Sequence, residues 1–141
     1  MTPTIQLTDP PNPAAEATAG KALYACNVAE TGIDDRQPIG CVARDPATGE
    51  AIGGLWGRTE MGLLFLDMFF LPEFLRGSGI GGRLLEEVEA EARRRGCRRA
   101  VVETSSFQAP GFYLRHGYME FGHVNFTVAD HARVFMTKEL A

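Results

Sequence analysis

A glycine-rich segment at residues 76–82, with the sequence Arg-Gly-Ser-Gly-Ile-Gly-Gly, has the composition of a phosphate-binding loop. Glycine leaves the backbone uncovered, and the first turn of a helix presents N–H groups that have no partner within the helix. Together with the positive end of the helix dipole, these groups form a site for an anion such as pyrophosphate. A connection without a ligand is disfavoured, because its four glycines cost backbone entropy.

Two nucleotide-binding motifs compete for this segment. A P-loop requires Gly-Lys-Ser or Gly-Lys-Thr, whereas Gly82 is followed by Arg-Leu, which argues against hydrolysis of nucleoside triphosphates. The dinucleotide fingerprint GxGxxG is satisfied by residues 77–82, and Glu103 lies at about the spacing of a ribose-binding acid. Against this reading, residues 72–76 separate the glycines from the preceding strand, and too few residues remain for a second mononucleotide-binding half.

Two carboxylates are placed where they can act on a bound ligand. Asp67 interrupts an apolar stretch, where a buried carboxylate is costly unless it is paired or faces a wet cleft. It therefore takes part in catalysis or amine binding, or it forms a salt bridge in the core. Glu103 lies at the end of the next expected strand, on the edge at which open α/β sheets place their ligands.

Hydrophobic periodicity and turn residues predict the elements that position these groups. The strand at residues 63–71 is apolar on both faces and therefore central, and a helix of about four turns joins it to a parallel strand. The last two strands are expected to be antiparallel. In chain order we expect strand 4–8, one or two helices over 14–29, strands 39–44, 51–59 and 63–71, helix 82–95, strand 99–103, helix 110–116, and strands 118–127 and 132–137.

The composition is that of one globular domain. A chain of 141 residues, 45% of them hydrophobic, buries a sizeable core but leaves no room for a second domain. The 14 basic and 18 acidic residues give a net charge of -4. This balance argues against a protein that binds nucleic acid, and it suits cationic small substrates.

Cysteine usage and the N-terminus indicate a cytoplasmic protein. The three cysteines are widely spaced and form no CxxC motif, and the histidines show no metal-ligand spacing. Residues 1–13 lack the basic start and apolar core of a signal peptide, and the longest apolar run, residues 62–71, is too short to span a membrane. We therefore expect no metal and no membrane partner.

Two motifs resemble those of the GNAT superfamily of N-acetyltransferases. The acetyl-CoA loop of that family reads Arg or Gln, two residues, Gly, one residue, then Gly or Ala, and Arg76, Gly79 and Gly81 match it. Within the family, residues 53–118 resemble small bacterial acetyltransferases of the kind that includes blasticidin S acetyltransferase. A second family motif, Ala, three residues, Tyr, then a basic residue near a Gly-aromatic pair, is matched by Ala109, Tyr113, Arg115, Gly117 and Tyr118.

The resemblance implies one acyltransferase domain over residues 1–141 of the α/β (α+β) class. Its mixed central sheet would have about six to seven strands, helices on both faces and one parallel crossover in the middle. Acetyl-CoA would be the co-substrate, with its pyrophosphate on the backbone of the loop and its pantetheine along the main chain of residues 68–70. Where many members have Asn, this chain has Ser106, whose hydroxyl can still donate to pantetheine. The implied cofactor-binding residues are Met68, Phe69, Phe70, Arg76, Gly77, Ser78, Gly79, Ile80, Gly81, Gly82, Arg83 and Ser106.

The same resemblance implies direct acetyl transfer to an amine in a ternary complex. It assigns Tyr113 as the general acid, although packing of its ring in the core is the plain alternative. Asp67, Glu103 or water would accept the amine proton, and with both carboxylates near the cleft we expect a small cationic amine. A non-catalytic acyl-CoA sensor with the same fold is the alternative. The sequence leaves open the identity of the acceptor, whether the acyl group is always acetyl, and the oligomeric state, a homodimer included.

Overall fold

The computed structural model describes residues 1–141, which divide into two compact units, Met1–Asp34 and Asp35–Ala141. The first unit holds one helix, α1 (Pro13–Thr31). Asn12 caps its start by accepting a hydrogen bond from the Ala15 N–H at 3.2 Å, and Gly32 ends it with a φ of 71°. The strand expected at residues 4–8 does not form, because an isolated strand leaves its backbone groups unpaired.

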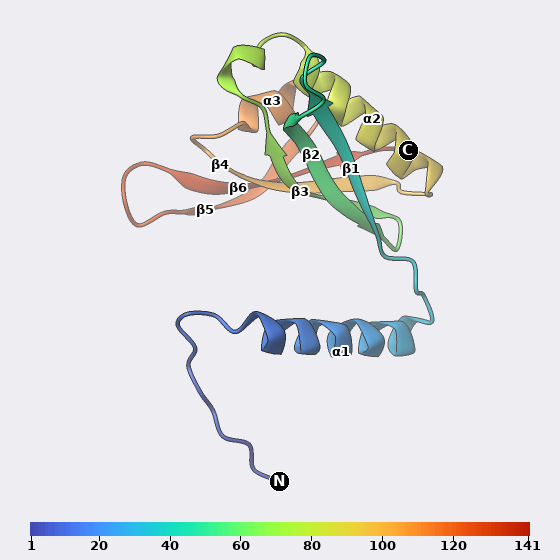
Figure 1. Cartoon of the computed structure of the whole chain (residues 1–141), viewed down its shortest axis with the longest axis vertical. Helices are drawn as coiled ribbons and strands as arrows, with labels where there is room; N and C mark the ends of the chain where they lie inside the picture. The colour runs from blue at the N-terminus through green and yellow to red at the C-terminus, as the bar shows by residue number, and fades with distance from the viewer. The chain divides into compact units, whose positions relative to one another are not determined.

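The second unit is built on a six-stranded mixed sheet with the order β1-β2-β3-β4-β6-β5 (Figure 1). Only β3 and β4 are parallel neighbours, and all other pairs are antiparallel. This topology and the flanking helices confirm the expected fold class. The strands are β1 (Gln37–Arg44), β2 (Ala51–Glu60), β3 (Leu63–Phe70), β4 (Arg99–Ser105), β5 (Met119–Asn125) and β6 (Ala132–Glu139).

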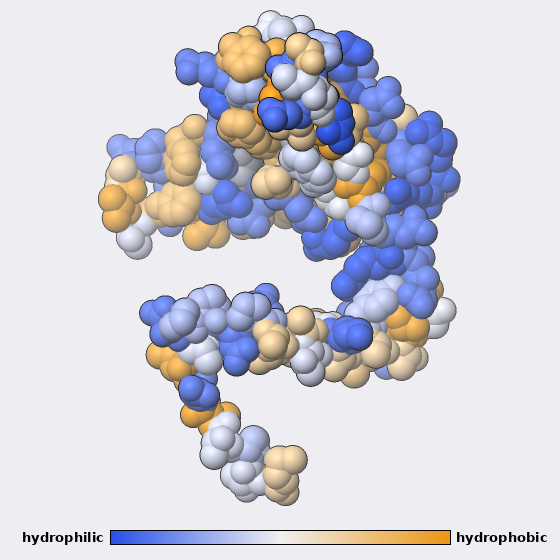
Figure 2. Space-filling model, viewed as in Figure 1, coloured by the Kyte–Doolittle hydropathy of each residue, from blue (hydrophilic) through white to orange (hydrophobic).

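The core lies between this sheet and the helices α2 (Ile80–Arg94) and α3 (Pro110–Arg115). Apolar residues at helical spacing in α2, such as Leu85 and Val88, are each 1% exposed and cover buried strand residues such as Leu64. The outer side of α2 is hydrophilic (Figure 2), and Arg94 pairs there with Glu91 at 2.8 Å. In the arginine run at the end of α2, Arg94 is solvated, whereas Arg93 and Arg95 donate to the carbonyls of Leu140 and Pro38. No helix in the chain has the length and apolarity that crossing a bilayer requires.

A buried ion pair ties α2 to β6. Glu89 is 4% exposed, and it accepts hydrogen bonds from the Tyr118 hydroxyl at 2.7 Å and from the Lys138 ammonium at 2.9 Å. Burial raises the pKa of Tyr118, and the charge of Glu89 raises it further. This phenol therefore remains a hydrogen-bond donor. The charge of Glu89 is therefore balanced mainly by the Lys138 ammonium and the Tyr118 hydroxyl, with the half-exposed guanidinium of Arg93 at 3.9 Å.

We expect Lys138→Met to lower the free energy of unfolding by about 2–4 kcal/mol, because it leaves the buried carboxylate of Glu89 without its nearer cation and with only Arg93, 3.9 Å away, as an ion-pair partner. Arg99→Met is the matched control, since the Arg99–Glu139 pair has side chains that are 64% and 72% exposed and adds little stability. Urea unfolding of both variants measures the difference. Equal stability of the two variants would contradict a structural role for the buried pair.

Candidate active site

The two parallel strands separate at their carboxyl ends. β3 and β4 pair only from Leu63 with Arg99 to Leu66 with Val102. Beyond this point each strand still pairs with its outer neighbour, β2 or β6, so their facing backbone groups have no partner across the gap. Such a gap accepts an extended ligand that pairs with the main chain as an added strand.

A bulge in β3 marks the point of separation. Trp56 of β2 pairs with Met68, whereas the next residue, Gly57, pairs with Leu66. Asp67 is therefore the extra residue of the bulge and has no partner on β2. A bulge bends its strand, and this one falls directly after Leu66, the last residue of β3 that pairs with β4.

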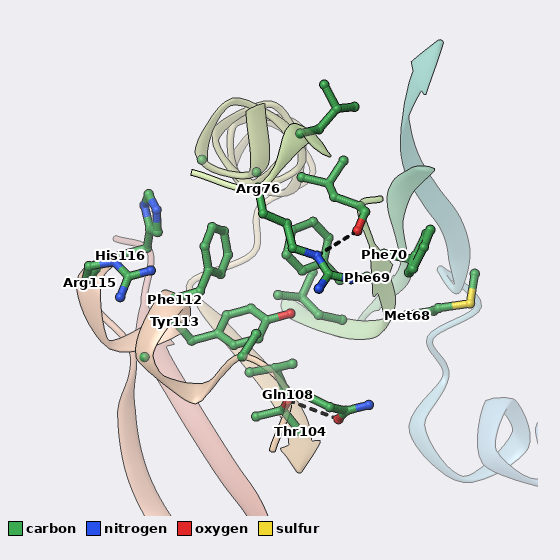
Figure 3. Close-up of a pocket in the computed structure, with 18 of the residues that line it drawn as sticks. Met68, Phe69, Phe70, Arg76, Thr104, Gln108, Phe112, Tyr113, Arg115 and His116 are labelled. Carbon is green, nitrogen blue, oxygen red and sulfur yellow. Dashed lines mark hydrogen bonds between the residues drawn. The ribbon is translucent and has the colours of Figure 1, made fainter. Parts of the chain in front are cut away.

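A cavity of about 990 Å³ opens at this gap, the volume of a large ligand site. Its walls come from the ends of β3 and β4, from the loop before α2, and from α3 (Figure 3). Among the predicted site residues it brings together the following: Asp67, Met68, Phe69, Phe70, Arg76, Gly77, Gly79, Gly81, Gly82, Arg83, Glu103 and Tyr113. The separate stretches of sequence that were assigned to one site therefore do meet in one cavity.

The glycine loop, residues 77–82, gives α2 an uncapped N-terminus. Gly77 and Gly79 have φ values of 77° and 87°, in the left-handed region that favours glycine. No side chain caps the helix, and its first backbone hydrogen bond runs from the Arg83 N–H to the Gly79 carbonyl at 3.2 Å. The preceding N–H groups are free to bind an anion.

The last two glycines of the loop allow α2 to approach α3 closely. A Cβ atom on Gly81 would lie 3.0 Å from the ring of Phe112, and one on Gly82 would lie 2.9 Å from the ring of His116. The rings of Phe112 and His116 are themselves 4.6 Å apart. This packing places His116 in the cavity wall beside Arg115. Sequence reasoning missed His116, for which the one signal was its spacing of three residues after Tyr113 on the expected helix.

Three arginines give this end of the cavity positive charge: Arg76, Arg83 and Arg115. The Nε of Arg76 donates to the Leu71 carbonyl at 3.0 Å, which fixes the guanidinium beside the end of β3 (Figure 3). Glu86 is the acidic residue among them. With the helix N-terminus, the guanidinium groups form a site for a phosphate-bearing ligand.

Three predicted cofactor residues do not line the cavity. The hydroxyl of Ser78 donates to the Leu75 carbonyl within the loop, and Ile80 packs against the core. Ser106 accepts a hydrogen bond from the Ala132 N–H at 2.9 Å. Gln108 occupies the cavity wall instead, where its carbonyl oxygen accepts from the Ser105 N–H at 2.8 Å.

Tyr113 is held by aromatic neighbours while its hydroxyl stays free. The residue is 3% exposed, and its ring lies 5.2 Å from that of Phe112 and 5.4 Å from that of Tyr118. The hydroxyl points into the cavity and forms no hydrogen bond within the protein (Figure 3). Burial raises the pKa of Tyr113 to about 12, so the hydroxyl remains protonated at neutral pH.

Both candidate carboxylates are paired with arginines. Asp67 contacts Arg58 of β2 at 2.6 Å, and the two side chains are 47% and 40% exposed. The expected salt bridge of Asp67 is therefore present, but at the cavity rim and not in the core. Glu103 contacts Arg133 of β6 at 2.8 Å, a partner that the sequence did not indicate. The structure brings together no three or more His, Cys, Asp or Glu side chains that could hold a metal ion.

Comparison with known proteins relates the chain to acetyltransferases. The profile described as Acetyltransferase (GNAT) family matches residues 4–118. An acetyltransferase of Agrobacterium fabrum is 38% identical over 112 residues, which are 77% of this chain and 81% of that protein. Blasticidin-S acetyltransferase of Streptomyces morookaense is 46% identical over 71 residues, 50% of this chain and 52% of that protein. An acetyltransferase of Bacillus cereus, known from a crystal structure, superimposes with a TM-score of 0.77 at 28% identity and 97% coverage of both chains.

Proposed function

Since this chain belongs to the acetyltransferase (GNAT) family, we propose that it transfers the acetyl group of acetyl-CoA directly to an amine in a ternary complex. One observation carries this proposal: the free hydroxyl of Tyr113 faces the cavity at the place where β3 and β4 no longer pair. Release of the CoA thiol that depends on an added amine tests it.

The proposed donor site runs from the glycine loop to the gap. The pyrophosphate would bind the free N–H groups of residues 77–82, with Arg76 and Arg83 close by. Arg115 and His116 add donors on the side of α3. Pantetheine would enter the gap and pair with the main chain of residues 68–70, which has no partner on β4. A thioester at this point would lie between the end of β3 and Tyr113.

The proposed reaction is one displacement. The amine nitrogen attacks the thioester carbonyl carbon, an N–C bond forms, and the C–S bond breaks to release CoA thiolate. A main-chain N–H of residues 68–70 stabilises the charge that develops on the carbonyl oxygen. The Tyr113 hydroxyl gives its proton to the thiolate, solvent later restores that proton, and the excess amine proton leaves through water or a carboxylate.

Asp67 and Glu103 are the carboxylates that can take this proton, since both line the cavity. An alkyl amine has a pKa near about 10 and arrives mostly protonated at neutral pH. We expect Asp67→Asn to lower kcat/KM mainly at low pH, where the amine is hardest to deprotonate. The pH profile of kcat/KM measures this, with Glu103→Gln as the parallel variant. Full activity of Asp67→Asn with only a lower melting temperature would leave Asp67 as a structural partner of Arg58.

Two observations weigh on the alternatives. A sensor that only binds acyl-CoA has no use for an unpaired hydroxyl that faces the gap, so Tyr113 favours an enzyme. A dinucleotide-binding protein turns from the strand directly into its glycine loop, whereas a 3-10 turn, η1 (Glu73–Leu75), intervenes here.

Blasticidin-S acetyltransferase acts, by its name, on a small molecule, and this supports a small-molecule amine as the acceptor. A cytoplasmic location and a homodimer stay predictions.

A further inference from the structure

Four charged side chains lie in a row across four neighbouring strands, β2, β3, β4 and β6. Arg58 and Asp67 form one ion pair at 2.6 Å, and Glu103 and Arg133 form the other at 2.8 Å. We call these four residues the charge row. Their order along the sheet is positive, negative, negative, positive.

The two acidic members are neighbours across the gap. Leu66 and Val102 are the last paired residues of β3 and β4, and Asp67 and Glu103 follow them directly. Leu66 and Val102 are buried in the core, so the alternation of side chains along a strand turns Glu103 to the opposite face of the sheet. Asp67 lies on that face as well, because its partner Arg58 stacks there over the ring of Phe65 at 4.2 Å.

The charges of the row cancel, and this balance indicates which charges a matching acceptor carries. Two carboxylates alone would attract any cation, but each already has a guanidinium beside it. A polyamine would place further positive charge near these guanidinium groups. A molecule with one ammonium group and one anionic group matches the row better, with the ammonium at the central carboxylates and the anion at one of the outer arginines.

Arg133 is the outer arginine that can reach such an anion. It lines the cavity, whereas Arg58 does not. Its Nε donates to Glu103 at 2.8 Å, and one terminal nitrogen donates to the hydroxyl of Ser105 at 2.9 Å. Ser105 is 2% exposed, so the guanidinium is anchored on two sides. Its other terminal nitrogen is free to donate to a carboxylate.

On the basis of the proposed acetyl transfer, we propose that the acceptor is an amine that also carries a carboxylate, and that Arg133 binds this carboxylate. Arg133 is then a residue that determines specificity and takes no part in the chemical step. It selects among amines by holding their anionic end while the ammonium group lies at Asp67 and Glu103.

The test uses matched acceptors: α-, β- and ω-amino acids, each beside its own carboxamide, with acetyl-CoA as donor. We expect the wild-type protein to favour an amino acid over its carboxamide by at least about tenfold in kcat/KM, the scale of one charge-assisted hydrogen bond. Arg133→Gln should remove this preference by raising KM for the acid, while turnover of the amide persists and reports a folded enzyme. Arg133→Lys, which keeps the charge without the planar guanidinium, should retain part of the preference for the amino acid.

Arg99→Gln is the control, because it removes the same charge from another ion pair between β4 and β6, and it should keep the preference. Equal use of acids and carboxamides by the wild type would overturn the inference, as would an unchanged preference in Arg133→Gln. Acetyl-CoA binding without turnover of any of these acceptors would also overturn it. Failure to bind acetyl-CoA at all would instead contradict the proposed function.

Discussion

Replacing Gly79 with glutamate is expected to weaken the binding of acetyl-CoA by at least about 100-fold. Gly79 is the residue just before α2, and its φ of 87° aims the adjacent N–H groups at the proposed pyrophosphate site. A glutamate there brings negative charge and bulk to the position of the phosphates. Loss of two hydrogen bonds to a charged group, at about 1.5–3 kcal/mol each, accounts for the expected size of the effect. Isothermal titration calorimetry measures it.

Gly79→Ala separates this effect from backbone strain. Alanine shares the cost of the left-handed conformation, roughly 1–2 kcal/mol, but no neighbouring atom lies within 4 Å of its added Cβ. We expect it to lower stability about as much as glutamate does and to retain most of the binding. Equal affinity of Gly79→Glu and Gly79→Ala would place the pyrophosphate elsewhere. Binding of NADH by the wild type in place of acetyl-CoA would support the dinucleotide fingerprint instead.

The second large effect concerns the hydroxyl of Tyr113. Tyr113→Phe removes one oxygen and keeps the ring that packs between Phe112 and Tyr118. We expect kcat to fall by about 10²-fold or more, the usual scale for a lost acid–base group, with the affinity for acetyl-CoA nearly unchanged. A thiolate whose thiol has a pKa near about 8.5 leaves more readily when a donor supplies a proton. Single-turnover kinetics with saturating acceptor gives the rate of the chemical step.

The pKa of Tyr113 adds a second readout. Burial raises it to about 12 from the ordinary value of 10, so the phenol is almost fully protonated at pH 10 and below. We therefore expect no fall in kcat between about pH 8 and 10 from ionisation of this group. Tyr118→Phe is the matched control, because its hydroxyl binds Glu89; it should lower stability and leave kcat in place. An unchanged rate of the chemical step in Tyr113→Phe would show that Tyr113 only packs in the core.

Local patterns in the sequence predicted most of the elements. The helical spacing of Leu84, Leu85 and Val88 predicted α2, and the helix between two apolar strands predicted the parallel pair β3 and β4. Strand order beyond this pair was not predictable, because periodicity tells which face a residue takes but not which strand lies next to it. Insertion of β6 between β4 and β5 is such a feature, and it alone places Arg133 beside Glu103.

The glycine loop of the site was predictable, because its backbone conformation requires a particular residue type. Glycines at positions with left-handed φ, such as Gly77 and Gly79, can be recognised from residue type. The bulge at Asp67 was not visible, since an inserted residue in one strand depends on the pairing with its neighbour. The place of Ser106 outside the cavity wall was not visible for a similar reason: its hydroxyl accepts a hydrogen bond from the Ala132 N–H, a contact set by the long connection to β6.

We propose that this protein moves an acetyl group from acetyl-CoA to an amine. The most direct measurement is the rate of CoA thiol release by the purified protein with acetyl-CoA, in the presence and absence of a panel of small amines, with mass spectrometry of the amine. We expect thiol release to depend on the amine, with one acetyl group on nitrogen for each thiol formed, and to fall by about 10²-fold in Tyr113→Phe. Tight binding of acetyl-CoA with no release above the amine-free rate for any amine would contradict the claim and identify the protein as an acyl-CoA sensor.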